Sequence, residues 1–190
     1  MEPLTVCGFS IGDGQAWAWA DAEAYDDGAP SGRDVRKMGV SVGGAVVIGA
    51  GDASVVGEVA QVAAQLKTTA LLVAVETMAE AAQYVAAAKR GLRESRGAAL
   101  PPSSHFGVVG VEGGRLRGFT MRQAEGFRLV EVEAWASPAS ASQPRSAAEV
   151  LAVALAQLEI IKREFPGATG RALTIAKIGP LGVATTTVRL

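Results

Sequence analysis

The sequence is poor in the residues that build disulfide frameworks and metal centres. Among its 190 residues it has one cysteine, Cys7, and one histidine, His105. A single cysteine excludes an intramolecular disulfide and a zinc site made from several thiolates. A single histidine argues against a histidine-rich metal site. The sequence therefore predicts neither a metal nor a cofactor.

The chain also lacks an excess of charge of either sign. It has 18 Lys and Arg against 19 Asp and Glu, a formal net charge of −1. Nucleic-acid-binding proteins usually carry a basic excess or patch, so we expect no nucleic-acid partner. No apolar run reaches the roughly 18 residues of a membrane span, and no basic-then-apolar leader opens the chain. These absences predict a soluble cytoplasmic protein that does not bind a membrane.

Small and apolar residues are abundant instead. Hydrophobic residues make up 49% of the chain, charged residues 19% and aromatic residues only 5%, and there are 23 glycines. This composition is typical of a chain that buries a core, which excludes disorder as the main state. Because no linker divides the 190 residues, we expect a single domain over residues 1–190.

The pattern along the chain predicts strands joined by glycine turns, and three helices. The second strand becomes polar at its far end, at Asp21 and Glu23, and Asp52 and Ser146 stand where helix N-caps are expected. The predicted order is strands 5–11, 15–25, 35–41 and 45–49, a loop over 26–32, helices 53–67 and 75–95, strands 106–111, 115–120 and 127–135, helix 146–164, and strands 171–178 and 182–189.

This order defines the fold class. Tight hairpins imply antiparallel sheets, and helices in separate blocks imply layers and not alternating βαβ units. We therefore expect an α+β protein with two antiparallel sheets packed together and helices outside. Helices 53–67 and 75–95 would cover one outer face, and helix 146–164 the other.

The first three predicted strands each contain one residue of a recognisable set: Thr5, Asp21 and Lys37, the last two 16 and 32 residues after Thr5. In the proteasome β-type family of N-terminal-nucleophile hydrolases, a threonine opens the first strand, an aspartate ends the second and a lysine begins the third. The order and spacing of the three residues resemble this family pattern. The resemblance covers nearly the whole chain and implies a four-layer α-β-β-α sandwich.

Three further segments strengthen the resemblance. The turn 49–52 (GAGD) resembles the family turn that binds an oxyanion, which implies this role for the N–H of Gly51 or of Gly49. Ser137 lies where the family has a Gly-Ser-Gly loop, and Thr169 lies where it has a Ser-Gly pair. The resemblance implies that Ser137 and Thr169 support the nucleophile and a water molecule.

The chemistry explains the residue types. A threonine hydroxyl is a weak nucleophile that needs a base, and a free α-amine on the same residue has a suitable, near-neutral pKa. A buried Lys37 would act electrostatically, and Asp21 would hold it charged, because an unpaired buried charge is costly. The amine exists only if residues 1–4 are removed as a leader. Leu4 precedes Thr5 where the active relatives usually have glycine.

The resemblance implies a ring-forming homo-oligomer that cleaves unfolded polypeptide in an inner chamber, with an unfoldase or activator ring as partner. Two substitutions favour an alternative, a catalytically inactive structural ring subunit of a larger assembly such as a phage-type particle. Pro166 replaces a family aspartate, and proline, not glycine, follows Ser137. The retention of Asp21 and Lys37 favours the threonine peptidase.

A third interpretation comes from the segment AVVIGAGDASVV. Its Gly49-x-Gly51-x-x-Ser54 spacing after a strand resembles a dinucleotide-binding fingerprint, with Glu76 near the place of a ribose-binding acid. Ser54 is only an approximate substitute for glycine or alanine. Two other residues have simple structural interpretations: Cys7 as a small buried apolar side chain on the strand face of Thr5, and His105 as an exposed loop residue.

Overall fold

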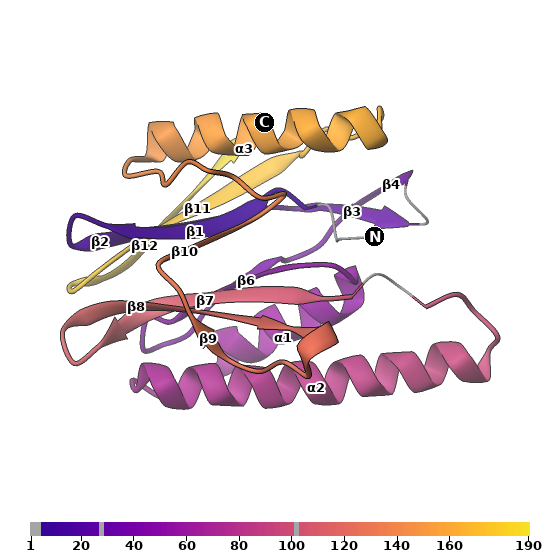
Figure 1. The fold of residues 1–190 in the computed structure, drawn as a ribbon, viewed down its shortest axis with the longest axis horizontal. Helices are drawn as coiled ribbons and strands as arrows, with labels where there is room; N and C mark the ends of the chain where they lie inside the picture. The colour runs from indigo at the N-terminus through magenta and orange to yellow at the C-terminus, as the bar shows by residue number, and fades with distance from the viewer. Residues whose placement is uncertain (1–4, 27–28, 101–102) are drawn as a thin grey trace.

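The computed structural model describes residues 5–26, 29–100 and 103–190, and the predicted leader, residues 1–4, lies outside them. Within these residues the chain is a mixed α/β protein with three α-helices and three antiparallel sheets (Figure 1). The helices are α1 (Ala53–Gln65), α2 (Leu71–Ser95) and α3 (Ala147–Glu164), and a short 3₁₀ turn, η1, covers Gln123–Glu125.

Two of the sheets have five strands. The first has the order β10-β1-β2-β11-β12, and its strands are β1 (Cys7–Gly12), β2 (Gln15–Asp21), β10 (Ala134–Ser137), β11 (Ala172–Gly179) and β12 (Gly182–Arg189). The second has the order β5-β6-β7-β8-β9, and its strands are β5 (Met38–Val40), β6 (Val46–Ala50), β7 (His105–Glu112), β8 (Arg115–Arg122) and β9 (Val130–Glu131). β3 (Glu23–Asp26) and β4 (Ala29–Asp34) form a two-stranded ribbon.

The strands on either side of the first helical block pair antiparallel. β6 precedes α1 and α2, β7 follows them, and Ile48 of β6 lies opposite Gly107 of β7. A dinucleotide-binding βαβ unit places such strands parallel. The topology therefore gives no support to the dinucleotide-binding interpretation of the 49–54 segment.

The predicted helix caps are present. Asp52 caps α1, because its Oδ1 accepts a hydrogen bond from the Ser54 N–H at 2.8 Å. Ser146 caps α3 by accepting from the Glu149 N–H. α2 begins at Leu71, four residues before the predicted start at 75, since the Glu112 carboxylate of β7 accepts the Leu71 N–H at 2.6 Å. A partner distant in sequence thus sets the start of α2.

Three apolar clusters account for the packing of these elements. One joins α3 to the first sheet through Trp19, Leu158 and Ile175. A second lies between the two five-stranded sheets and includes Phe9 and Ile48. A third joins α1 and α2 to the other side of the second sheet, and its members include Val47, Val59, Val75, Met78 and Phe106. Figure 1 shows α3 on one side of the molecule and α1 and α2 on the opposite side.

Glycine allows the two large sheets to approach closely. A Cβ at Gly107 would lie 2.8 Å from the Phe9 ring, and a Cβ at Gly118 would lie 2.4 Å from it. Phe9 belongs to the first sheet, whereas both glycines belong to the second. The abundance of small residues in the sequence therefore serves sheet-on-sheet contact.

The structure differs from the predicted strands in several places. The predicted strand 15–25 is divided between β2 of the first sheet and β3 of the ribbon, and the predicted strand 35–41 is shortened to β5. The predicted loop over 26–32 contains strand β4 and the end of β3, so there is a third sheet where only two were expected. The predicted strand 127–135 is divided, because β9 pairs with β8 of the second sheet and β10 with β1 of the first. The chain crosses between the sheets at Val132, whose N–H donates to Gly118, and Glu133, whose carbonyl accepts from Ile11.

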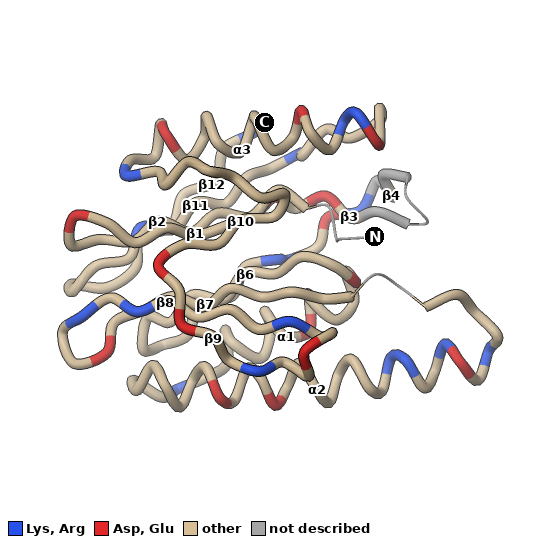
Figure 2. The backbone as a smooth tube through the Cα atoms, viewed as in Figure 1, with Lys and Arg blue, Asp and Glu red and all other residues tan. Residues whose placement is uncertain are grey.

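Helix α2 is long and apolar enough to cross a membrane by length and composition, contrary to the expectation that no segment would qualify. This is weak evidence for a span, because one face of the helix is buried against the second sheet in the third cluster. The C-terminal end of α2 extends beyond the sheets and carries both signs of charge (Figures 1 and 2). There Arg90 pairs with Glu94 at 3.0 Å and Lys89 pairs with Glu58, as expected for a solvated helix end.

Candidate functional site

The topology brings four of the predicted site residues to one end of the first sheet. Thr5 lies just before β1, and Asp21 is the last residue of β2. Ser137 ends β10, opposite Cys7 of β1. Thr169 lies three residues before β11, which pairs with β2. Because neighbouring strands run antiparallel, the start of β1 is flanked by the ends of β2 and β10.

The other two predicted residues lie at the matching end of the second sheet. Lys37 immediately precedes β5, and its carbonyl accepts the Gly49 N–H at 3.1 Å. Gly51 follows β6 and precedes the N-cap of α1. Gly51 has a φ of +114°, and a Cβ there would lie 2.6 Å from the Cα of Ser104, so only glycine fits.

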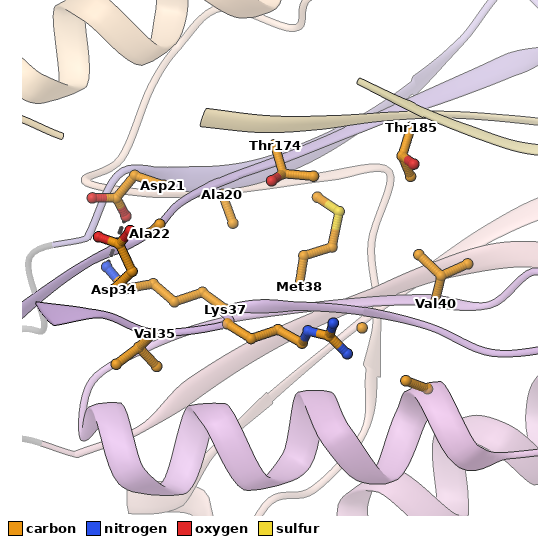
Figure 3. A pocket seen from close by; sticks show the side chains of 13 residues that line it. Ala20, Asp21, Ala22, Asp34, Val35, Lys37, Met38, Val40, Thr174 and Thr185 are labelled. Carbon is orange, nitrogen blue, oxygen red and sulfur yellow. Dashed lines mark hydrogen bonds and ion pairs between the residues drawn. The ribbon is translucent and has the colours of Figure 1, made fainter. Parts of the chain in front are cut away.

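An ion pair connects the two sheet ends. Lys37 Nζ lies 2.8 Å from Asp21 Oδ1, and the side chains are 4% and 0% exposed. Figure 3 shows Lys37 extended toward Asp21. The second oxygen, Oδ2, has no hydrogen-bond partner within the described residues. Burial raises the pKa of Asp21, and the charge of Lys37 opposes that rise. The pairing of these two residues, which the family resemblance implied, is present.

Thr5 itself is buried. Its exposed fraction is 4%, although it lies at the end of the first sheet where β1 begins. Across the sheet, the Asp21 N–H donates to the carbonyl of Val6 at 2.8 Å, which sets Thr5 beside the end of β2. The Thr5 side chain is therefore shielded from solvent in this structure.

Gln157 of α3 binds the backbone on both sides of the Ser137–Cys7 pair, and this role was not predicted from the sequence. Its Nε2 donates to the carbonyls of Cys7 at 3.0 Å and Pro138 at 2.8 Å. Its Oε1 accepts from the Trp19 indole N–H at 2.8 Å. One buried side chain thus joins α3, β1, β2 and the loop after β10. A glutamine on the apolar face of the predicted helix was the available signal.

Glu23 binds the loop that contains Thr169, and it was also not predicted as a site residue. Its carboxylate accepts hydrogen bonds from Thr169 and from the Gly170 N–H. Glu23 is 1% exposed. The sequence placed Glu23 on the strand face of Asp21, and this was interpreted only as the polar end of a strand.

Cys7 fits its simple structural interpretation. It is fully buried, and burial raises the pKa of its thiol, with Lys37 opposing the shift and Asp21 adding to it. The Ser137 N–H donates to its sulfur. A thiol that stays protonated is a poor nucleophile. His105, in contrast, was predicted wrongly: it begins β7 and its ring lies 4.4 Å from that of Trp135.

A cavity of about 490 Å³ lies beside the ion pair (Figure 3). β2, β11 and β12 border it on one side, and β5 with the residues before it borders the other. Its polar lining includes Arg36, Thr174 and Thr185, in addition to Asp21 and Lys37. Within the described residues, no group of three or more His, Cys, Asp or Glu side chains is placed to hold a metal ion.

No family model matches this chain, and no curated protein aligns with it significantly. A buried lysine paired with an aspartate can lower the barrier to attack by a nearby hydroxyl, such as that of a threonine at the start of the adjacent strand. The N–H groups of a glycine turn that begins a helix can stabilise an oxyanion.

Proposed function

We propose that this chain is a ring-forming proteasome β-type subunit in which Thr5 becomes an N-terminal threonine nucleophile. The observation that carries the proposal is the buried Lys37–Asp21 ion pair beside the start of β1. The outer positions of the three helices support the four-layer α-β-β-α sandwich that belongs to this proposal.

In the proposed mechanism, the Thr5 hydroxyl attacks a peptide carbonyl of an unfolded polypeptide, and the freed α-amine of Thr5 takes the proton through a water molecule. Lys37 favours the reaction electrostatically, and Asp21 holds Lys37 in place. The N–H of Gly51, or that of Gly49, binds the oxyanion. The cavity beside Lys37 gives room for a substrate side chain.

Assembly and partners follow from the same proposal. Copies of the chain form a closed homo-oligomeric ring with the Thr5 residues facing an inner chamber. Folded proteins are excluded from such a chamber, so an unfoldase or activator ring delivers the polypeptide. Light scattering of the purified protein tests the ring, and a 19 kDa monomer at micromolar concentration contradicts it.

The second candidate is a structural ring subunit that lacks turnover. It is favoured by Pro166, which has no side chain able to accept or relay a proton, and by the burial of Thr5 in the unprocessed chain. The Lys37–Asp21 pair is then a structural ion pair. The two candidates differ in one property, the presence of a free amine on Thr5.

Intact mass and turnover separate the candidates. The full chain is expressed, its mass is measured, and fluorogenic peptides and an epoxyketone inhibitor are applied. The peptidase is supported if residues 1–4 are lost and if Thr5→Ala and Lys37→Ala each abolish activity. The control Thr186→Ala, on the exposed strand β12, should keep its activity. An intact chain without turnover leaves the structural subunit, and equal turnover in wild type and Thr5→Ala places the nucleophile elsewhere.

A further inference from the structure

Glu23 is a buried carboxylate that the proposed mechanism does not use. It begins β3 and is 1% exposed. Its Oε2 accepts the N–H groups of Thr169 at 2.9 Å and Gly170 at 2.8 Å, and its Oε1 accepts the Thr169 hydroxyl at 3.0 Å. A buried carboxylate is costly unless donors compensate it, so this one is matched to the 169–170 loop.

These bonds determine which way the Thr169 hydroxyl faces. The Thr169 hydroxyl donates to Glu23 Oε1, so the hydroxyl hydrogen of Thr169 points to that oxygen. The lone pairs of the Thr169 oxygen are then left for any other partner. Thr169 can accept a further hydrogen bond but has no second hydrogen to donate.

We propose that Glu23 is a positioning residue of the candidate site, which orients the Thr169 hydroxyl as an acceptor for the freed α-amine of Thr5. This inference rests on the proposed function. It also accounts for Pro166, because the carboxylate absent from the 166–170 segment is supplied by β3, across the sheet end. Glu23 is electrostatically coupled to Asp21 as well, so its charge acts on the ion pair.

The substitution Glu23→Gln tests the orientation. The glutamine keeps one acceptor oxygen for the loop N–H groups, but its NH₂ group then faces the Thr169 oxygen. That oxygen must accept from the amide, and its hydrogen turns toward Thr5. Because Glu23 is only 1% exposed and acts through Thr169, we expect kcat to fall about 10- to 100-fold while KM stays unchanged.

Matched variants complete the experiment. Thr169→Val removes the hydroxyl and is expected to lose as much kcat as Glu23→Gln, whereas Thr169→Ser keeps the hydroxyl and retains activity. The double variant Glu23→Gln/Thr169→Val should lose no more than either single variant, since both act through one hydroxyl. Glu159→Gln, an exposed glutamate of α3, controls for the loss of a charge. All rates are normalised to inhibitor-titrated active sites, so a merely structural defect does not change kcat.

Each outcome is decisive. If wild type turns over peptide and Glu23→Gln matches Glu159→Gln, the role of Glu23 is overturned while the proposed function stands. If the losses of the two single variants multiply in the double variant, Glu23 does not act through Thr169. If wild type shows no Thr5-dependent turnover, the proposed function falls, and the role of Glu23 falls with it.

Discussion

Replacing Lys37 by methionine removes the cation from a carboxylate that is shielded from water. The Nζ–Oδ1 separation is 2.8 Å. At an effective dielectric constant of about 20, two unit charges at this separation attract by about 6 kcal/mol. The cost of removing both groups from water offsets several kcal/mol of that attraction. When Lys37 alone is lost, Asp21 stays buried, so its share of this desolvation cost remains without the compensating attraction. We therefore expect Lys37→Met to lower the free energy of unfolding by about 3–5 kcal/mol.

The loss should depend on pH with a definite sign. Burial already raises the pKa of Asp21, and Lys37 opposes that rise, so Lys37→Met moves the pKa of Asp21 further up. Between the unfolded value of about 3.9 and the folded value, the native state binds more protons than the unfolded state. The contribution of Asp21 to the stability of Lys37→Met is thus greatest at low pH and declines as pH rises through that interval. The deficit of Lys37→Met relative to wild type is larger at pH 8 than at pH 5.

Urea unfolding at pH 5 and pH 8 measures both effects. Lys177→Met is the matched control, because Lys177 is exposed and its Nζ lies 5.7 Å from the centroid of the Trp17 ring. It should change stability by less than about 1 kcal/mol. Adding Asp21→Asn to Lys37→Met removes the unpaired charge and should recover part of the loss. A Lys37→Met deficit below that of the control, or one that does not vary with pH, would refute the reasoning.

Three further predictions concern other buried groups. Gln157→Leu leaves the Trp19 indole and two carbonyls without their partner, and should lower stability by about 3 kcal/mol or more in calorimetry; an unchanged melting temperature contradicts this. Burial, with help from Arg122, lowers the pKa of His105 to about 4. The unfolded state therefore binds more protons between pH 6.5 and 4, and stability falls as pH falls through that window. His105→Phe should weaken this pH dependence in urea unfolding, and an unaltered slope argues against it. Cys7 should resist iodoacetamide in the folded protein and react in urea, whereas rapid labelling of the folded chain would show that the thiol is accessible.

The sequence could predict features that are set by neighbouring residues. Strand pairs joined by glycine turns, such as the hairpin around Gly113 and Gly114, were expected and are present. The caps at Asp52 and Ser146 were also expected, since a cap depends on residues two or three positions away. The pairing of Asp21 and Lys37 was expected only through the resemblance to the proteasome β-type family, and the two side chains do form an ion pair.

Features set by distant residues could not be predicted in the same way. The predicted strand 127–135 is divided because its earlier part, β9, pairs with β8, whereas its later part, β10, pairs with β1. The β3–β4 ribbon forms from a segment rich in turn residues, where local preference gave a loop. Glu23 contacts Thr169 across 146 positions, and Gln157 contacts Cys7 across 150. The residues that neighbour Glu23 and Gln157 in the sequence do not indicate which distant groups they bind.

The distribution of buried polar groups bears on which candidate function is correct. Ten polar or charged residues are buried among the described residues. Two of them bond away from the site, since Ser10 of β1 donates to the Pro144 carbonyl and Ser41 accepts the Ala45 N–H. The other eight lie at or next to the sheet ends that hold the ion pair, namely Thr5, Asp21, Glu23, Lys37, Asp52, Ser104, Ser137 and Gln157. Buried ion pairs are often no more stabilising than apolar residues of the same volume. Asp52 serves as a helix cap and Gln157 links α3 to the first sheet, so these two have structural roles. For the others, packing alone gives no reason to gather at these ends, and a site that handles charge and protons is what the proposed function requires.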